Sequence, residues 1–223
     1  MRKNKKNYVI FAIICLLALL TMALSLFLKK KNEFNYSESR DEVIATTTEG
    51  TLYLHDLNYY VMIEEESVNE TAIAYDEENP KAYWNLYIDN TFVNEEARRT
   101  VIDYMLKDYL ISLEAIDAGV SLSKAEEEDS NTKAIAMASD LNERQIAAGI
   151  TEDDLIHTLS INALSNKYSI MMAKDANIDL TDEAISAFYG INSKYFKNLK
   201  KKYDVKLNDK LIEKISLGTI TIN

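Results

Sequence analysis

The chain has 223 residues, a formal net charge of −11 at pH 7, one Pro, five Gly, two His and one Cys. A single Cys excludes a disulfide within the chain, and two His with no Cys nearby give no basis for a His/Cys zinc site. The scarcity of Gly and Pro disfavours a sheet-rich fold with many tight turns. We therefore predict a mainly helical protein that holds no cofactor and no metal.

Residues 8–28 form an uncharged apolar run, YVIFAIICLLALLTMALSLFL, with basic residues on both sides. A helix of that length spans roughly 32 Å, against about 30 Å of hydrocarbon in a bilayer. We predict an uncleaved, single-pass signal anchor in a bacterial cell membrane, with residues 1–7 in the cytoplasm and the C-terminal domain extracytoplasmic. A signal peptide cleaved near Ala23-Leu24-Ser25 is the alternative. A lipoprotein is excluded, because Cys15 lies in the middle of the run.

Charge is distributed unevenly along the chain. Seven of the 25 basic residues but none of the 36 acidic residues lie in residues 1–31, so the remainder carries a net charge of −18. This balance excludes nucleic acid as a partner. It indicates either a solubilising surface or a preference for basic or unfolded polypeptides. The eight Lys between 194 and 214 predict a solvated helix face; alternatively, they lie across the acidic stretches 126–129 or 152–154, or face the membrane.

The predicted extracytoplasmic part begins with a flexible linker over residues 29–42, followed by a domain over residues 43–223. Residues 43–54 show two extended, β-branched or alternating stretches on either side of Glu49-Gly50, and this pattern predicts a small hairpin. A helix follows from His55-Asp56. Asn79 with Pro80 predicts a short helix to about Tyr87.

The middle of the chain shows helical periodicity and repeated helix starts. Asn94 is predicted to cap a helix that ends at Gly119, and Ser123 with Glu126 forms a capping box for a helix to Gly149. Thr151 with Asp154 and then Thr181 start two more helices. In the tail, VKL is predicted to be extended and NDKLIEKI a short helix. GTITI is predicted to be a strand that pairs with the hairpin near residue 45.

Four of these junctions, in order, resemble the SurA/PrsA-type chaperone-foldases. They are VIATTTEGTLYLHDLNYYVM, EAIDAGVSLSKAEEE, AAGITEDDL and ANIDLTDEAISAFY, which together span about residues 43–190. Where many family members have Asn before the hairpin Gly, this chain has Glu49. The resemblance implies a multi-helix domain like the N-terminal domain of SurA, which holds extended polypeptide against a helical cradle.

In foldase members the last junction leads into a parvulin prolyl isomerase domain of about a hundred residues. Here the 33 residues after Gly190 contain neither His nor Cys. The resemblance therefore implies the chaperone module without the enzyme. The predicted partners are unfolded or partly folded secreted polypeptides, and the membrane through the N-terminal helix. A dedicated interaction subunit of a cell-envelope or secretion complex and a degenerate isomerase remain the alternatives.

Aromatic residues and Met are the candidates for client binding, because they combine large apolar area with polar or adaptable groups. No catalytic residue is predicted. Consecutive acids such as Glu64–Glu66 and Glu126–Glu128 point in different directions on a helix, so they predict solvated faces rather than a catalytic or calcium site. The candidate client-binding residues are Tyr59, Tyr60, Trp84, Tyr87, Tyr104, Tyr109, Tyr168, Met171 and Met172.

Overall fold

The computed structural model describes residues 34–222, so the predicted anchor at residues 8–28 lies outside the described residues. The chain divides into a unit of residues 1–35 and a compact unit of residues 36–223, and the fold below is that of the second unit. Within residues 34–222, no helix combines the length and apolarity needed to cross a bilayer. Residues 36–42, assigned above to the linker, belong to the compact unit: Tyr36 is buried, and Arg40 donates to Asp154 at 2.9 Å.

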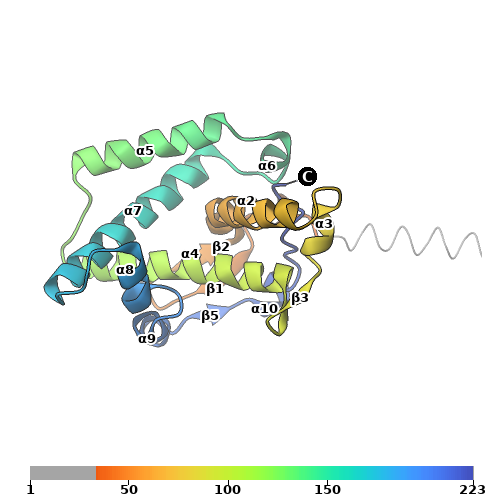
Figure 1. The fold of residues 1–223 in the computed structure, drawn as a ribbon. Helices are drawn as coiled ribbons and strands as arrows, with labels where there is room; N and C mark the ends of the chain where they lie inside the picture. Colours follow the sequence, from red (N-terminus) through yellow and green to blue (C-terminus); the bar gives the residue numbers. More distant parts are fainter. Residues whose placement is uncertain (1–33, 223) are drawn as a thin grey trace, which may run out of the picture. The chain divides into compact units, whose positions relative to one another are not determined.

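The compact unit is mainly helical, as the composition predicts, with two small antiparallel sheets (Figure 1). Its framework consists of α2 (Asn58–Tyr75), α4 (Val93–Asp117) and α7 (Glu152–Asp175), which pack against one another, while α5 (Lys124–Ser139) packs along α7. Among the described helices, α4 buries the most apolar side chains, and it packs against both α2 and α7. The shorter helices are η1 (Leu54–Leu57), α3 (Pro80–Tyr83), α6 (Glu143–Ala147), α8 (Asp182–Tyr189), α9 (Lys194–Lys202) and α10 (Asp209–Ile212).

Local capping places three of the predicted helix starts correctly, those at Ser123, Thr151 and Thr181. The boxes at Ser123 and Thr151 both form, and the Thr181 side chain accepts a hydrogen bond from the N–H of Ala184. The predicted helix through Gly149 is wrong, because α5 ends at Ser139. A second capping box then starts α6. The Asn142 side chain accepts hydrogen bonds from two backbone N–H groups, and Oε1 of Gln145 accepts one from the backbone N–H of Asn142.

The first sheet has the order β2-β1-β5. Strands β1 (Val43–Thr46) and β2 (Thr51–Tyr53) form the predicted hairpin. Strand β5 (Lys206–Leu207), the VKL segment, pairs antiparallel with β1, with Leu207 opposite Ala45. A strand from the C-terminal region therefore does pair near residue 45, but GTITI does not form it. Residues 219–222 form no strand, and the backbone N–H groups of residues 219–221 donate to the carboxylate of Glu65 instead.

The second sheet was not predicted. Strands β3 (Tyr87–Ile88) and β4 (Thr91–Phe92) form a hairpin around Asp89 and Asn90, which adopt positive φ angles of 50° and 69°. Two successive residues with positive φ make a two-residue turn whose twist matches that of the flanking strands. The predicted helix to Tyr87 therefore ends at Tyr83. Because β4 runs directly into α4, Phe92 rather than Asn94 precedes the first helical residue.

The Lys-rich segment only partly forms a solvated face. In α9, Lys200 pairs with Asp103 at 3.1 Å and Lys202 with Glu114, and both acids lie on α4. The acidic stretches proposed as its partners pair elsewhere, Glu126 with Lys167 and Asp154 with Arg40. The remaining Lys of α9, at positions 194, 197 and 201, are exposed as predicted.

Replacing Gly218 with Ala should destabilise the fold by about 2–4 kcal/mol, since strain and overpacking add. Gly218 has φ +89°, and a Cβ there would lie 2.4 Å from Cδ2 of Trp84. Gly119→Ala is the matched control: φ is +72°, but a Cβ there meets nothing within 4 Å, so only the backbone strain remains. Urea unfolding of both variants measures the difference. An equal cost would show that the contact with Trp84 is not tight.

Candidate functional site

The run Glu64-Glu65-Glu66 on α2 sends its carboxylates to three different places. Glu64 and Glu66 line two separate cavities on either side of the helix. Glu65 has no exposed surface, so the prediction that this run is a solvated face is wrong at its central residue. The carboxylate of Glu65 can be buried because hydrogen-bond donors of the chain surround it.

Glu65 holds residues 218–221 through both carboxylate oxygens. Oε1 accepts hydrogen bonds from the backbone N–H groups of Gly218, Thr219 and Ile220, at 2.5, 3.1 and 3.2 Å. Oε2 accepts from the backbone N–H and the hydroxyl of Thr221, at 2.6 and 2.5 Å. A buried carboxylate is tolerated when its acceptor capacity is filled in this way. The C-terminal segment is thereby fixed against α2.

The same segment is also bound to α6. Asn142 donates from Nδ2 to the carbonyl oxygen of Thr221 at 3.2 Å, and Arg144 donates to the carbonyl oxygen of Thr219 at 3.1 Å. Residues 218–222 therefore bridge α2 and α6. Thr221 and Ile222 form one wall of the cavity that opens on the Glu66 side of α2.

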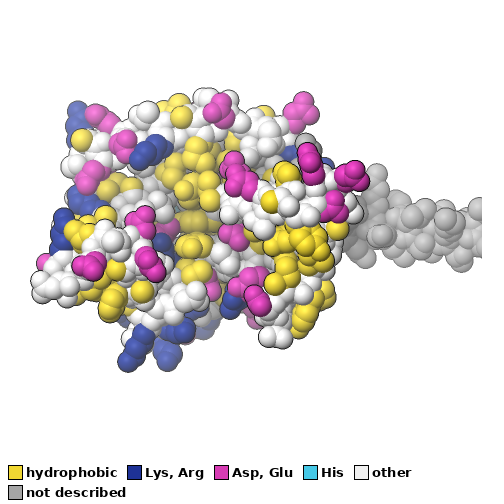
Figure 2. Space-filling model, in the orientation of Figure 1, with side chains coloured by type: hydrophobic (Ala, Val, Ile, Leu, Met, Phe, Trp, Pro, Cys, Tyr) yellow, Lys and Arg dark blue, Asp and Glu magenta, His cyan; other side chains and the backbone are white. Residues whose placement is uncertain are grey.

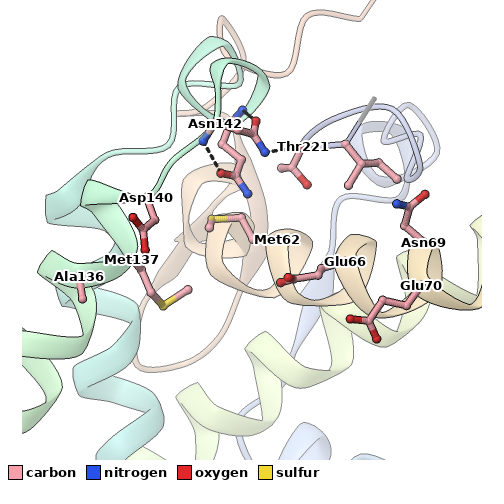
Figure 3. A pocket seen from close by; sticks show the side chains of 11 residues that line it. Met62, Glu66, Asn69, Glu70, Ala136, Met137, Asp140, Asn142 and Thr221 are labelled. Carbon is pink, nitrogen blue, oxygen red and sulfur yellow. Dashed lines mark hydrogen bonds between the residues drawn. The ribbon is translucent and has the colours of Figure 1, made fainter.

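That cavity, the α2–α5 cleft, has a volume of about 620 Å³. Figure 3 shows the side chains of Met62 and Met137 extending from α2 and α5 into the space between these helices, with Glu66 beside them. Figure 2 shows apolar side chains exposed between α5 and α2, at the centre of the face in view. The lining residues are Met62, Glu66, Asn69 and Glu70 of α2; Ala136, Met137 and Asp140 at α5; Asn142 and Gln145 at α6; and Thr221 and Ile222.

The cleft combines adaptable apolar surface with unpaired negative charge. Met62, which is 7% exposed, and the half-buried Met137 supply thioether side chains, a type that adapts to contacts of varied shape. Glu66, Glu70 and Asp140 are exposed, and none of them forms an ion pair within residues 34–222. No Lys or Arg is among the eleven lining residues. This chemistry suits a polypeptide that carries both apolar and basic side chains.

Between α2, α4 and α7 lies a buried polar network centred on Asp108. Its carboxylate accepts hydrogen bonds from Tyr60 at 2.9 Å, Asn162 at 2.8 Å and Ser165 at 2.8 Å, and pairs with Lys107 at 2.7 Å. Burial and then the adjacent Asp108 raise the pKa of Tyr60 well above its usual value, so its hydroxyl stays protonated and donates. Asp108 itself is buried and its acceptor capacity is filled from three helices, so the network joins α2, α4 and α7.

The two His approach the same carboxylate. Nε2 of His55 and Nε2 of His157 lie 3.7 and 3.9 Å from Oδ1 of Asp56. Nδ1 of His55 also lies 3.1 Å from the carbonyl oxygen of Arg40. Within residues 34–222, however, no group of three or more His, Cys, Asp or Glu is arranged to hold a metal ion.

The candidate client-binding residues do not gather in one place. Their side chains are exposed at Tyr87, Tyr104 and Met171, half-buried at Tyr59, Tyr109, Tyr168 and Met172, and buried at Tyr60 and Trp84. Tyr104 lines a cavity of about 410 Å³ between α4, α7 and α8, and Tyr87 lies on the β3–β4 hairpin.

None of the candidates lines the α2–α5 cleft. The signal that could have indicated this face is the spacing of Met62, Glu66, Asn69 and Glu70, which puts them on one side of a helix.

Comparisons with known proteins give no relative. No protein-family model matches the chain, and searches of curated proteins and of solved structures find no match.

Proposed function

We propose that this protein is a membrane-anchored, extracytoplasmic, chaperone-like protein that binds unfolded or partly folded secreted polypeptides without catalysis. The observation that carries the proposal is the α2–α5 cleft, in which two Met and three unpaired acids face a space of about 620 Å³. The membrane anchor and the resemblance to SurA/PrsA-type chaperones are part of the proposal.

The cleft has the properties that weak, broad recognition requires. Unfolded clients differ in shape, and unbranched Met side chains adjust to them at little cost. The acids on its rim attract basic segments at long range, and this attraction weakens with salt. Recognition of this kind needs no nucleophile and no bound cofactor.

Binding of a short, unstructured synthetic peptide rich in Leu and Lys tests the proposal. We expect the full chain, reconstituted in lipid nanodiscs, to bind the peptide and to suppress aggregation of an unfolded protein. Met137→Glu should weaken the affinity about tenfold or more, because a tenfold loss corresponds to about 1.4 kcal/mol and a buried charge opposes apolar contact. Fluorescence anisotropy measures the affinity, with empty nanodiscs as blank.

Ile135→Glu is the matched control for this experiment. Ile135 is exposed on the same helix but does not line the cleft, so the variant should bind like the wild type. Absence of binding, or an equal loss in both variants, would contradict the proposal. Recovery of a single stoichiometric partner from membranes, rather than many weak clients, would favour a dedicated interaction subunit instead.

A further inference from the structure

The cavity of about 410 Å³ between α4, α7 and α8 shares no lining residue with the α2–α5 cleft. On each of the three helices, lining residues recur at three or four positions, which is the spacing of one helical face. Its volume falls among those of pockets that bind ligands, about 300–1,000 Å³. We call it the α8 pocket and define it by Tyr104 and Lys107 of α4, Ser169 and Ile170 of α7, and Ile185 and Tyr189 of α8.

The walls of the α8 pocket carry apolar side chains that the fold leaves uncovered. Tyr104 and Ile170 are exposed. Helix α8 buries none of its side chains, and Ile185 and Tyr189 are half-buried. The ring of Tyr189 meets that of Tyr195 edge to face, with centroids 5.2 Å apart, which orders it in advance. Aromatic groups that are already ordered lose little entropy when a ligand binds.

A buried hydroxyl without a partner lines the same pocket. Ser169 is 6% exposed, and its hydroxyl makes no hydrogen bond within residues 34–222. In that part of the chain, only Oγ of Ser130 is fully enclosed without a partner, so the hydroxyl of Ser169 is reached from the cavity that it lines. Buried polar groups normally have a hydrogen-bond partner. A ligand in the α8 pocket would supply the one that Ser169 lacks.

The remaining polar groups of the pocket disfavour a charged ligand. Lys107 already pairs with Asp108 at 2.7 Å, and it would repel a cation. Asp182, in the first turn of α8, is exposed and would repel an anion. Asn166 donates to Asn162 at 3.0 Å, and its own carbonyl oxygen accepts nothing within the described residues. An uncharged ligand that both donates and accepts hydrogen bonds fits these groups, and a peptide unit does both.

We propose that the α8 pocket binds an uncharged, apolar segment of a polypeptide. An apolar side chain of the segment lies among Tyr104, Ile170 and Tyr189, and the adjacent peptide group bonds to the hydroxyl of Ser169. The proposal rests on the proposed function and deepens it: the α2–α5 cleft takes basic, apolar segments, and the α8 pocket takes uncharged ones. A client that carries both kinds of segment would bind more tightly than either segment alone, because its second contact is intramolecular.

Two matched peptides test this proposal on the full chain in nanodiscs of zwitterionic lipid, with fluorescence anisotropy as the readout. One is a short, unstructured Gly/Ser peptide with a central Leu-Phe pair, and the other carries Lys-Lys in place of that pair. Ile170→Glu should weaken binding of the Leu-Phe peptide about tenfold or more, because a charge opposes apolar contact. It should not weaken binding of the Lys-Lys peptide. Ile116→Glu is the matched control, since Ile116 is exposed on α4 but does not line the pocket.

Ser169→Ala separates loss of the site from loss of the fold. The hydroxyl has no partner to lose, so the urea midpoint should equal or exceed that of the wild type. Affinity for the Leu-Phe peptide should fall about two- to tenfold, as for one hydrogen bond. Unchanged affinity in Ile170→Glu or Ser169→Ala, or an equal loss in Ile116→Glu, would overturn the proposal. Failure of the α2–α5 cleft would appear differently: the Leu- and Lys-rich peptide would be insensitive to Met137→Glu, while Ile170→Glu still weakened the Leu-Phe peptide.

Discussion

Glu65→Ala should lower the free energy of unfolding by about 3–5 kcal/mol, because removing one side of a buried, hydrogen-bonded charge leaves its partners unsatisfied. The substitution deprives four backbone N–H groups and one hydroxyl of their acceptor and leaves a cavity next to α2. Urea denaturation followed by circular dichroism measures the loss.

Glu66→Ala is the control, because the next residue along α2 is exposed and makes no ion pair within residues 34–222. Its cost should stay within about 0.5 kcal/mol, as for most surface substitutions. The loss of unfolding free energy in Glu65→Gln should lie between those of the two Ala variants. One acceptor oxygen remains in Gln, while its NH₂ group faces N–H and O–H donors. If Glu65→Ala and Glu66→Ala cost the same, the C-terminal segment is not held by this carboxylate.

Asp108→Ala should cost a similar amount, about 3–5 kcal/mol, through the same mechanism. The hydroxyls of Tyr60 and Ser165 and the amide of Asn162 would lose their shared acceptor, and Lys107 would keep a charge that is largely shielded from water. Chemical denaturation again gives the free energy. Because the network joins three helices, we expect cooperative loss of the whole domain rather than fraying of one element.

Asp103→Ala is the control for Asp108→Ala, because both residues lie on α4. Asp103 pairs with Lys200 across α4 and α9, but both side chains are partly exposed, at 23% and 35%. Pairs of this kind contribute about 1 kcal/mol or less. Should the loss at Asp103 equal that at Asp108, the buried network would have no special part in joining the helices.

The features that the sequence predicts correctly are local ones. A capping box involves residues three apart, so Ser123 with Glu126 and Thr151 with Asp154 can be recognised without a fold. The low content of Gly and Pro, which favours helices, can likewise be read without knowing any contact in the fold. The β3–β4 hairpin was missed because its turn uses Asp89-Asn90 rather than a Gly. The box at Asn142 was missed because its helix is one short turn.

The features that could not be predicted depend on distant partners. Glu65 looks like its neighbours in sequence, and its first backbone partner lies 153 residues away. Whether Trp84 or Tyr87 is exposed depends likewise on what packs over it, and Trp84 is covered by the chain around Gly218. The α2–α5 cleft joins α2, α5, α6 and residues 221–222, so only the folded arrangement reveals it.

The attachment of residues 218–221 to Glu65 also constrains when the domain can complete its fold. Polypeptides emerge from the ribosome N-terminus first, so α2 is made long before the segment that donates hydrogen bonds to its inward-facing Glu65. Until that segment arrives, Glu65 has to remain hydrated and α2 cannot settle into place. A nascent copy that lacks residues 218–222 also lacks one wall of the cleft. The α2–α5 cleft is therefore complete only after synthesis has passed residue 222.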